Sequence, residues 1–139
     1  MSITLTNVSC VAIDGRAVLI EGESGSGKSS LALALIDRGA LLIGDDGVTL
    51  DERDGRLWAL PPPNIADLIE VRNVGLLTLP AGSAPLALVV RLDPAAPRLP
   101  DGADRFEITG HALPLLTLWP GSSVLPLRTE LALKTYGLS

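Results

Sequence analysis

The stretch Gly22-Glu23-Ser24-Gly25-Ser26-Gly27-Lys28-Ser29 decides how the rest of the chain is interpreted. It matches the phosphate-loop pattern Gly-x-x-x-x-Gly-Lys-Ser/Thr at every defined position. The apolar residues 17–20 before it predict a short buried strand, and residues 30–38 after it predict a helix that ends at Gly39. A plain glycine-serine turn requires neither the lysine nor this order of strand, loop and helix. We therefore interpret the stretch as a phosphate-binding loop.

The residue types of this loop suit the binding of a nucleoside triphosphate. Glycines allow successive backbone N–H groups to point at phosphate oxygens, and the start of the following helix adds a partial positive charge. Lys28 can reach the β- and γ-phosphates, and the Ser29 hydroxyl can bind Mg²⁺. The loop contacts phosphate and carries no preference for one base. The predicted nucleotide-binding residues are Gly22, Glu23, Ser24, Gly25, Ser26, Gly27, Lys28, Ser29 and Ser30.

Composition and charge narrow the function classes. The chain has 139 residues, the size of one domain, and its 47% hydrophobic and 3% aromatic content predicts an aliphatic core. The net charge of −5, without a Lys/Arg cluster, argues against a nucleic-acid partner. Cys10 is the only cysteine, which excludes an internal disulfide. We see no signal peptide and no apolar run near the ~20 residues of a membrane span, so we expect a cytoplasmic protein without a membrane partner.

The order of predicted elements is rich in strands. Besides the phosphate-loop helix, a last helix is expected from Ser122 or Ser123 to about Tyr136, with Pro126 in its first turn. This order departs from the regular alternation of strands and helices in ordinary nucleotide kinases. We expect a single α/β domain over residues 1–139, a P-loop type of fold with a mixed sheet and a C-terminal helix. The predicted strands cover residues 3–6, 9–13, 17–20, 41–44, 48–50, 57–60, 86–92, 106–108 and 113–118.

Two adjacent carboxylates are the next candidates for chemistry. Asp45 and Asp46 end the strand that follows the phosphate-loop helix, so they lie near the loop if the strands are neighbours. In a phosphoryl-transfer site one carboxylate can hold Mg²⁺ and another can accept the proton of the attacking hydroxyl. A solvated Asp-Asp-Gly turn explains the same residues. Asp93, at the end of the strand 86–92, is a rival acid, but Arg91 beside it weakens that reading, and we favour the pair.

A third candidate lies in residues 70–76. Glu70 and Arg72 alternate with apolar residues, which places both on one face if this segment is a strand. They are then either an exposed ion pair or a second Mg²⁺ ligand with a phosphate clamp. The pattern alone leaves both readings open.

With these three motifs in order, the sequence resembles the catalytic domain of HPr kinase/phosphorylase. That family has a Gly-Glu-Ser-Gly-x-Gly-Lys-Ser loop, an Arg-Gly helix end and an Asp-Asp strand end, which this chain matches at the same spacing from lysine to aspartates. The family's Glu-Ile-Arg-Gly-Leu-Gly-Ile signature is similar to residues 70–76. A later Arg-Leu pair is similar to Arg98-Leu99. The resemblance runs from about Leu5 to Leu118.

The resemblance implies an enzyme that uses ATP and Mg²⁺ to phosphorylate a serine of the phosphocarrier protein HPr of the phosphotransferase system. It also implies a homo-oligomer. By this resemblance Asp46 is the general base, Lys28 binds the phosphates and Arg98 is an active-site arginine. The metal ligands it implies are Ser29, Asp45 and Glu70.

The chain also departs from the family. The family's catalytic histidine falls on Asn7, which cannot carry a proton. Residues 119–122 read Trp-Pro-Gly-Ser, where the family has an Arg-Pro-Gly-Arg-Asn loop associated with dephosphorylation. The N-terminal domain of longer members has no counterpart. His111, the lone histidine, is interpreted as a surface or packing residue. These differences leave the reverse reaction undecided.

Two other functions are compatible with the same loop. A non-catalytic sensor would bind ATP and regulate a partner without turnover, and Asn7 motivates that hypothesis. A small-molecule P-loop kinase would use Asp93 as its metal-binding acid. Substitution of Asp46 or Asp93 separates the three functions.

Overall fold

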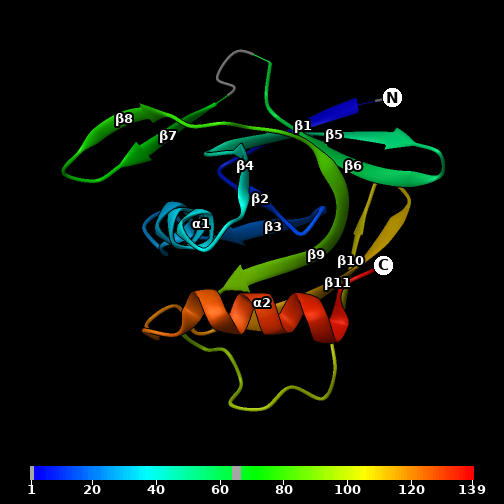
Figure 1. Cartoon of the computed structure of the whole chain (residues 1–139). Helices are drawn as coiled ribbons and strands as arrows, with labels where there is room; N and C mark the ends of the chain where they lie inside the picture. The colour runs from blue at the N-terminus through cyan, green and yellow to red at the C-terminus, as the bar shows by residue number, and fades with distance from the viewer. Residues whose placement is uncertain (1, 64–66) are drawn as a thin grey trace.

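A computed structural model describes residues 2–63 and 67–139 of the chain. Two helices and a strand-rich core make up the described part (Figure 1). The elements in chain order are β1 (Ser2–Thr6), β2 (Ser9–Ile13), β3 (Arg16–Gly22), α1 (Lys28–Asp37), β4 (Leu41–Gly44), β5 (Gly47–Arg53), β6 (Arg56–Leu60), β7 (Leu68–Val71), β8 (Gly75–Thr78), β9 (Ala84–Leu92), β10 (Asp104–Ile108), β11 (His111–Leu118) and α2 (Leu125–Tyr136).

The sheet is mixed, as the sequence predicts. Its main path has the order β1-β5-β6-β9-β3-β2-β4, and β10 and β11 join at β9. The β9 strand pairs antiparallel with β6 at Ala84 and Pro85, and then runs parallel to both β3 and β11. The strand that leads into the phosphate loop, β3, therefore lies between β9 and the antiparallel β2. Because β3 and β4 are both antiparallel to β2, the carboxyl ends of β3 and β4 lie at the same end of the sheet, and the loop follows β3 there.

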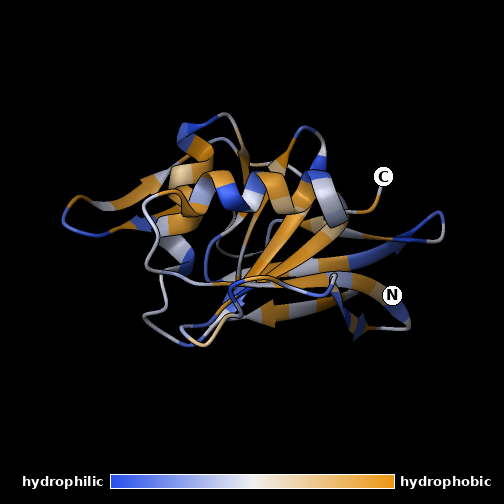
Figure 2. Ribbon diagram, turned by 90° about the horizontal axis from the view of Figure 1, so that it is seen from below, coloured by the Kyte–Doolittle hydropathy of each residue, from blue (hydrophilic) through white to orange (hydrophobic). Residues whose placement is uncertain are grey.

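The core has two apolar layers because alternate side chains of a strand point to opposite faces. In β3, Val18 and Ile20 pack with the buried residues of α1 and α2. Ala17 and Leu19, on the opposite face, pack with residues of β5, β6 and β9. These four side chains are at most 1% exposed. Figure 2 shows the hydrophobic colour concentrated in the strands that lie beneath the helices.

The helices begin and end where local sequence dictates. Gly27 precedes α1 with φ of 104°, a left-handed conformation that costs glycine little. Pro126 occupies the first turn of α2, where its missing N–H would have no helical partner. Arg38 donates to Glu130 at 2.7 Å and so joins the end of α1 to α2.

Within the described residues no helix is both long enough and apolar enough to cross a membrane.

One local expectation is wrong. The segment 70–76 is a hairpin of β7 and β8 with a turn after Val71, and Asn73 takes φ of 71° in that turn. Glu70 therefore lies on a strand and Arg72 in the turn, so they do not share one face of a continuous strand. Asparagine tolerates the left-handed conformation better than most residues, and Gly75, two residues later, also has positive φ. Figure 1 shows this two-stranded ribbon extending from the body of the protein beside α1.

Candidate active site

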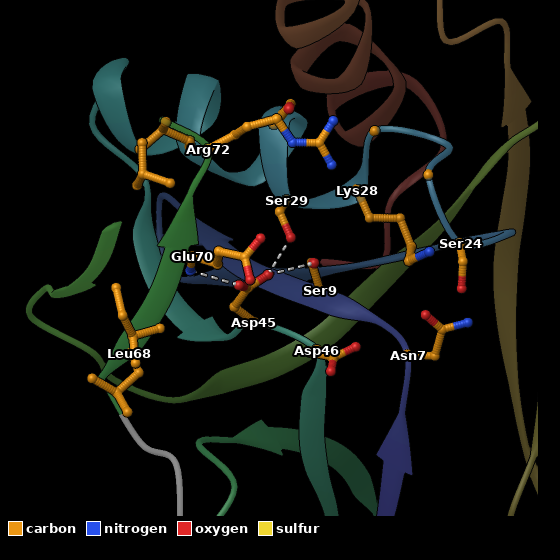
Figure 3. A pocket seen from close by; sticks show the side chains of 16 residues that line it. Asn7, Ser9, Ser24, Lys28, Ser29, Asp45, Asp46, Leu68, Glu70 and Arg72 are labelled. Carbon is orange, nitrogen blue, oxygen red and sulfur yellow. Dashed lines mark hydrogen bonds between the residues drawn. The ribbon is translucent and has the colours of Figure 1, made fainter. Parts of the chain in front are cut away.

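A cavity of about 600 Å³ lies between the phosphate loop, the turn after β4 and the β7–β8 ribbon (Figure 3). It gathers most of the residues that the sequence motifs predict, although they come from four separate elements. The predicted site residues that line it are Ser24, Gly25, Gly27, Lys28, Ser29, Ser30, Asp45, Asp46 and Glu70, together with Asn7 and Arg72.

The Lys28 ammonium closes the phosphate loop on itself. Its Nζ donates to the carbonyl oxygens of Gly22 and Glu23, each at 2.9 Å, and the residue is 8% exposed. A lysine ammonium has three N–H donors, so one donor remains for a phosphate oxygen when these two contacts are kept. The loop thus holds a cation and the start of α1 at one end of the cavity.

The Asp45 carboxylate is a junction of hydrogen bonds. Its Oδ1 accepts from the Ser29 hydroxyl at 2.6 Å and from the Ser9 hydroxyl at 3.2 Å. Its Oδ2 accepts from the backbone N–H of Glu70 at 3.1 Å. Asp45 is 8% exposed, so these donors replace most of its contact with water. The carboxylate joins α1, β2 and β7 to the end of β4.

The neighbouring Asp46 has the opposite environment. It is exposed, it takes φ of 60°, and within residues 2–63 and 67–139 no hydrogen bond reaches its carboxylate. Its backbone carbonyl accepts from the N–H of Asn7 at 3.2 Å, and Asn7 also has a left-handed backbone, with φ of 58°. Figure 3 shows both side chains among those that line the cavity, with Lys28 and Ser24 across from them. A carboxylate placed there is accessible to a hydroxyl group entering from solvent.

The donor set fits Mg²⁺ chemically. Magnesium prefers oxygen ligands and keeps several waters or substrate phosphates, so it needs one or two carboxylates from the protein. The cavity offers the Ser29 hydroxyl and the Asp45 and Glu70 carboxylates. The part of the chain that the structure describes has no cluster of three or more His, Cys, Asp or Glu residues that would enclose a metal without substrate.

Other predicted residues lie elsewhere. Gly22, Glu23 and Ser26 line a second cavity of about 810 Å³, which shares Ser24 and Gly25 of the loop with the first. Asp93 also lines that second cavity, and its Oδ1 accepts from Ala95 N at 2.8 Å, as expected of an acid in a strand-exit turn.

Two further residues are remote from the loop. Arg98 lies in the exposed segment between β9 and β10 and lines neither cavity. The side chain of His111 contacts Glu52 at 2.6 Å, so it joins β11 to β5.

Ser9 is a site residue that the sequence analysis did not identify. It is 1% exposed and lies in the cavity lining, within hydrogen-bond distance of Asp45. Its only sequence signal is a hydroxyl at the start of an otherwise apolar strand. That signal does not reveal which residue lies opposite, because the pairing of β2 with β4 is irregular at this point.

Comparisons with known proteins agree with the geometry. The family model of the HPr Serine kinase C-terminal domain matches residues 2–82. The chain belongs to this family. An HPr kinase/phosphorylase of Streptococcus pneumoniae is 33% identical over 129 residues, covering 81% of this chain and 42% of that protein. One from Clostridium novyi is 45% identical over 71 residues, covering 51% of this chain and 23% of that protein.

A solved structure shows the family fold as well. The Hpr(Ser) kinase/phosphatase from Coxiella burnetii superposes with a TM-score of 0.82 at 29% identity, covering 95% of this chain and 88% of that one. The predicted P-loop type of fold, with its mixed sheet and C-terminal helix, is confirmed. The chain nevertheless spans less than half the length of the curated relatives named above.

Proposed function

We propose that this protein is an ATP- and Mg²⁺-dependent serine kinase that phosphorylates an HPr-type phosphocarrier protein. The observation that carries the proposal is one cavity lined by the phosphate loop, by the buried acid Asp45 beside Ser29 and by the exposed acid Asp46. Family membership and the names of the relatives support the same activity. The acting unit is the single domain of residues 1–139.

The proposed roles follow from position. Lys28 and the loop N–H groups hold the β- and γ-phosphates, and Asp46 faces the incoming serine hydroxyl. As the serine oxygen bonds to the γ-phosphorus, the bond from that phosphorus to the bridging oxygen of ADP breaks, and the serine proton passes to Asp46. Ser29, Asp45 and Glu70 would hold Mg²⁺, which neutralises the charge on the phosphates.

A protein acceptor suits the surroundings of the cavity better than a small molecule. The β7–β8 ribbon beside it exposes Val74 by 67%, Leu76 by 66% and Leu77 by 36%. Leu76 also lines the cavity, so the apolar surface continues from its rim. A small acceptor would leave this surface in water, whereas a protein that presents a serine would cover it.

Two parts of the proposal rest on family resemblance, and a third rests on where the substrates occur. We infer that Arg98 acts on the acceptor side when its loop and the acceptor meet, since it lines neither cavity in the structure. We also infer a homo-oligomer and a cytoplasmic location, where ATP and phosphocarrier proteins are available.

Intact-mass spectrometry of the organism's HPr-type protein, after incubation with this protein and Mg-ATP, tests the function. A gain of one phosphoryl group that disappears with Lys28→Ala is the expected result. The Streptococcus pneumoniae relative serves as the active control. No gain in mass, while that control phosphorylates its own HPr, would overturn the proposal.

Two alternatives have their own signatures. A non-catalytic ATP sensor, motivated by Asn7 in the cavity lining, binds ATP without transfer and is indifferent to Asp46→Asn. A small-molecule kinase that uses Asp93 loses turnover with Asp93→Asn and keeps it with Asp46→Asn. The turn hydrogen bond of Asp93 and its place in the second cavity favour the carboxylate pair instead.

A further inference from the structure

Ser9 is buried, and within residues 2–63 and 67–139 the one hydrogen bond of its side chain lies in the candidate active site. It begins β2, is 1% exposed, and donates to Asp45 Oδ1 at 3.2 Å. Burying a hydroxyl without a hydrogen-bond partner costs free energy, so a buried serine in an apolar strand requires an acceptor. Here the acceptor is a carboxylate that also binds the hydroxyl of the phosphate loop.

The strand pairing explains why Ser9 reaches Asp45. Cys10 pairs with Gly44, and Val11 pairs with Leu42, so the register of β2 and β4 shifts between these two residues of β2. The shift accommodates one extra residue of β4, and it leaves Ser9 opposite the first residue of the turn that follows. A regular ladder would have placed the serine one residue away from the carboxylate.

The hydrogen bonds limit what Asp45 can do. A carboxylate oxygen has two lone pairs, and those of Oδ1 are taken by Ser9 and Ser29. Ser29 is the donor in its contact at 2.6 Å, so its own lone pairs stay free for a cation. Oδ2 accepts from Glu70 N, which fixes β7 against the turn. Asp45 therefore orients Ser29 and β7, and one lone pair of its Oδ2 remains for a cation.

We propose that Ser9 is a positioning residue for magnesium binding, acting through Asp45 on the Ser29 hydroxyl and on the β7 ribbon. The inference rests on the proposed function in one respect, that the bound nucleotide is a magnesium complex. Its physical basis is that Ser9 prevents the Asp45 carboxylate from rotating away from Ser29. Outer partners of this kind commonly alter metal affinity by ~10–100-fold when they are removed.

The test measures binding and does not depend on phosphoryl transfer. A fluorescent N-methylanthraniloyl analogue of ATP is titrated into the wild type and Ser9→Ala, at increasing magnesium and in EDTA. Ser9→Ala should raise the magnesium concentration at half-maximal enhancement of binding by ~10-fold or more, with binding in EDTA unchanged. The matched control is Thr129→Val, which removes another buried hydroxyl, donating to Leu125 O at 2.9 Å in α2 and lining neither cavity. Its midpoint should equal that of the wild type.

A double-mutant cycle separates positioning from general damage. Because Ser9 is proposed to act partly through Ser29, adding Ser9→Ala to Ser29→Ala should shift the midpoint less than Ser9→Ala does alone. Thermal unfolding checks that each variant folds. If Ser9→Ala does not fold, Ser9→Cys, with similar shape and a weak donor, should shift the midpoint in the same direction.

The outcomes are distinct. A wild-type magnesium midpoint in folded Ser9→Ala, or equal additive shifts in the cycle, would overturn the role of Ser9 while leaving the kinase proposal standing. Absence of transfer to HPr with the expected midpoint shift would overturn the kinase proposal and leave the role of Ser9 intact.

Discussion

Two regions of the molecule carry predicted site residues in different ways. In the first region, called the ordered side below, the ends of β2, β4 and β7 bring Ser9, Asp45 and the backbone of Glu70 into hydrogen-bond contact. In the second region, the exposed segment between β9 and β10, Arg98 lines neither cavity. Strand register fixes the first group before any ligand binds. A contribution from the second requires the loop or a partner to move, so the two regions should respond differently to substitution.

The largest effect is expected from the open carboxylate on the ordered side. Asp46→Asn removes the proposed base while keeping the size of the side chain and the left-handed backbone that asparagine also tolerates. Turnover should fall by ~10²–10⁴-fold, since that is the range for a lost general base. Mg-ATP affinity should be unchanged. Single-turnover transfer to HPr and equilibrium nucleotide binding measure the two quantities, and unchanged turnover would exclude Asp46 as the base.

The next largest effect is expected at the phosphate loop. Lys28→Ala removes a cation that lies 2.9 Å from the carbonyl oxygens of Gly22 and Glu23 and is proposed to contact the γ-phosphate. Transfer should fall by ~10²–10³-fold, comparable to removing one donor that stabilises transition-state charge. Nucleotide affinity should weaken as well. Wild-type affinity for Mg-ATP in this variant would contradict the assignment of the loop.

A substitution at Gly44, which precedes Asp45 and is not itself a candidate ligand, tests whether strand register positions the carboxylate. A Cβ on Gly44 would collide with the carbonyl oxygen of Gly47 and approach Pro62 Cδ to 3.2 Å. Gly44→Ala should therefore lower the free energy of unfolding by ~1–3 kcal/mol, as overpacking does. The tight turn that carries Asp45 should shift with it. Chemical denaturation gives the first quantity and the magnesium midpoint the second. Gly55→Ala, which meets open space but carries the strain of a positive φ, shows the cost of backbone strain without a collision.

A small effect on nucleotide binding is expected from the other region. Arg98→Ala should leave Mg-ATP affinity within about twofold of the wild type, because exposed groups outside a site contribute little to binding there. Any loss should appear in the transfer step. A large loss of nucleotide affinity would show that the loop closes onto the phosphates, and the contrast between the two regions would then fail.

The smallest effect is expected when the native protein is treated with a thiol reagent, whose target is Cys10, beside Ser9 in β2. It is fully buried, and burial raises the pKa of its thiol far above the usual range, so the reactive thiolate does not form near neutral pH. A thiol reagent should label it only after denaturation. Rapid labelling of the native protein would mean that the edge of the sheet at β4 opens readily.

Much of the ordered side was predictable from local signals. The glycine pattern, the strand before it and the helix after it give the phosphate loop, and a strand that ends in two acids gives Asp45 and Asp46. Most of the strands, and both helices, lie where apolar runs and turn residues indicate. These features depend on residues close in sequence, where periodicity and turn chemistry are informative.

The parts that escaped prediction depend on pairing between distant segments. Ser9 meets Asp45 only because the register of β2 and β4 shifts by one residue, and a single sequence does not specify that shift. The turn after Val71 was missed because apolar residues continue on both sides of it. The different environments of Asp45 and Asp46 likewise arise from the turn, since the two side chains are chemically identical.

The long β9 strand gives the protein an order of assembly. The family model's match stops at residue 82, before β9 begins at Ala84, yet β9 is the parallel neighbour of β3. Glu21 pairs in register with Arg91, and closing so long a segment is slow compared with forming a hairpin. During synthesis the phosphate loop therefore emerges well before the strand that supports it. Nascent chains that end before residue 92 should expose the apolar edge of β3 and depend on chaperones until β9 has left the ribosome.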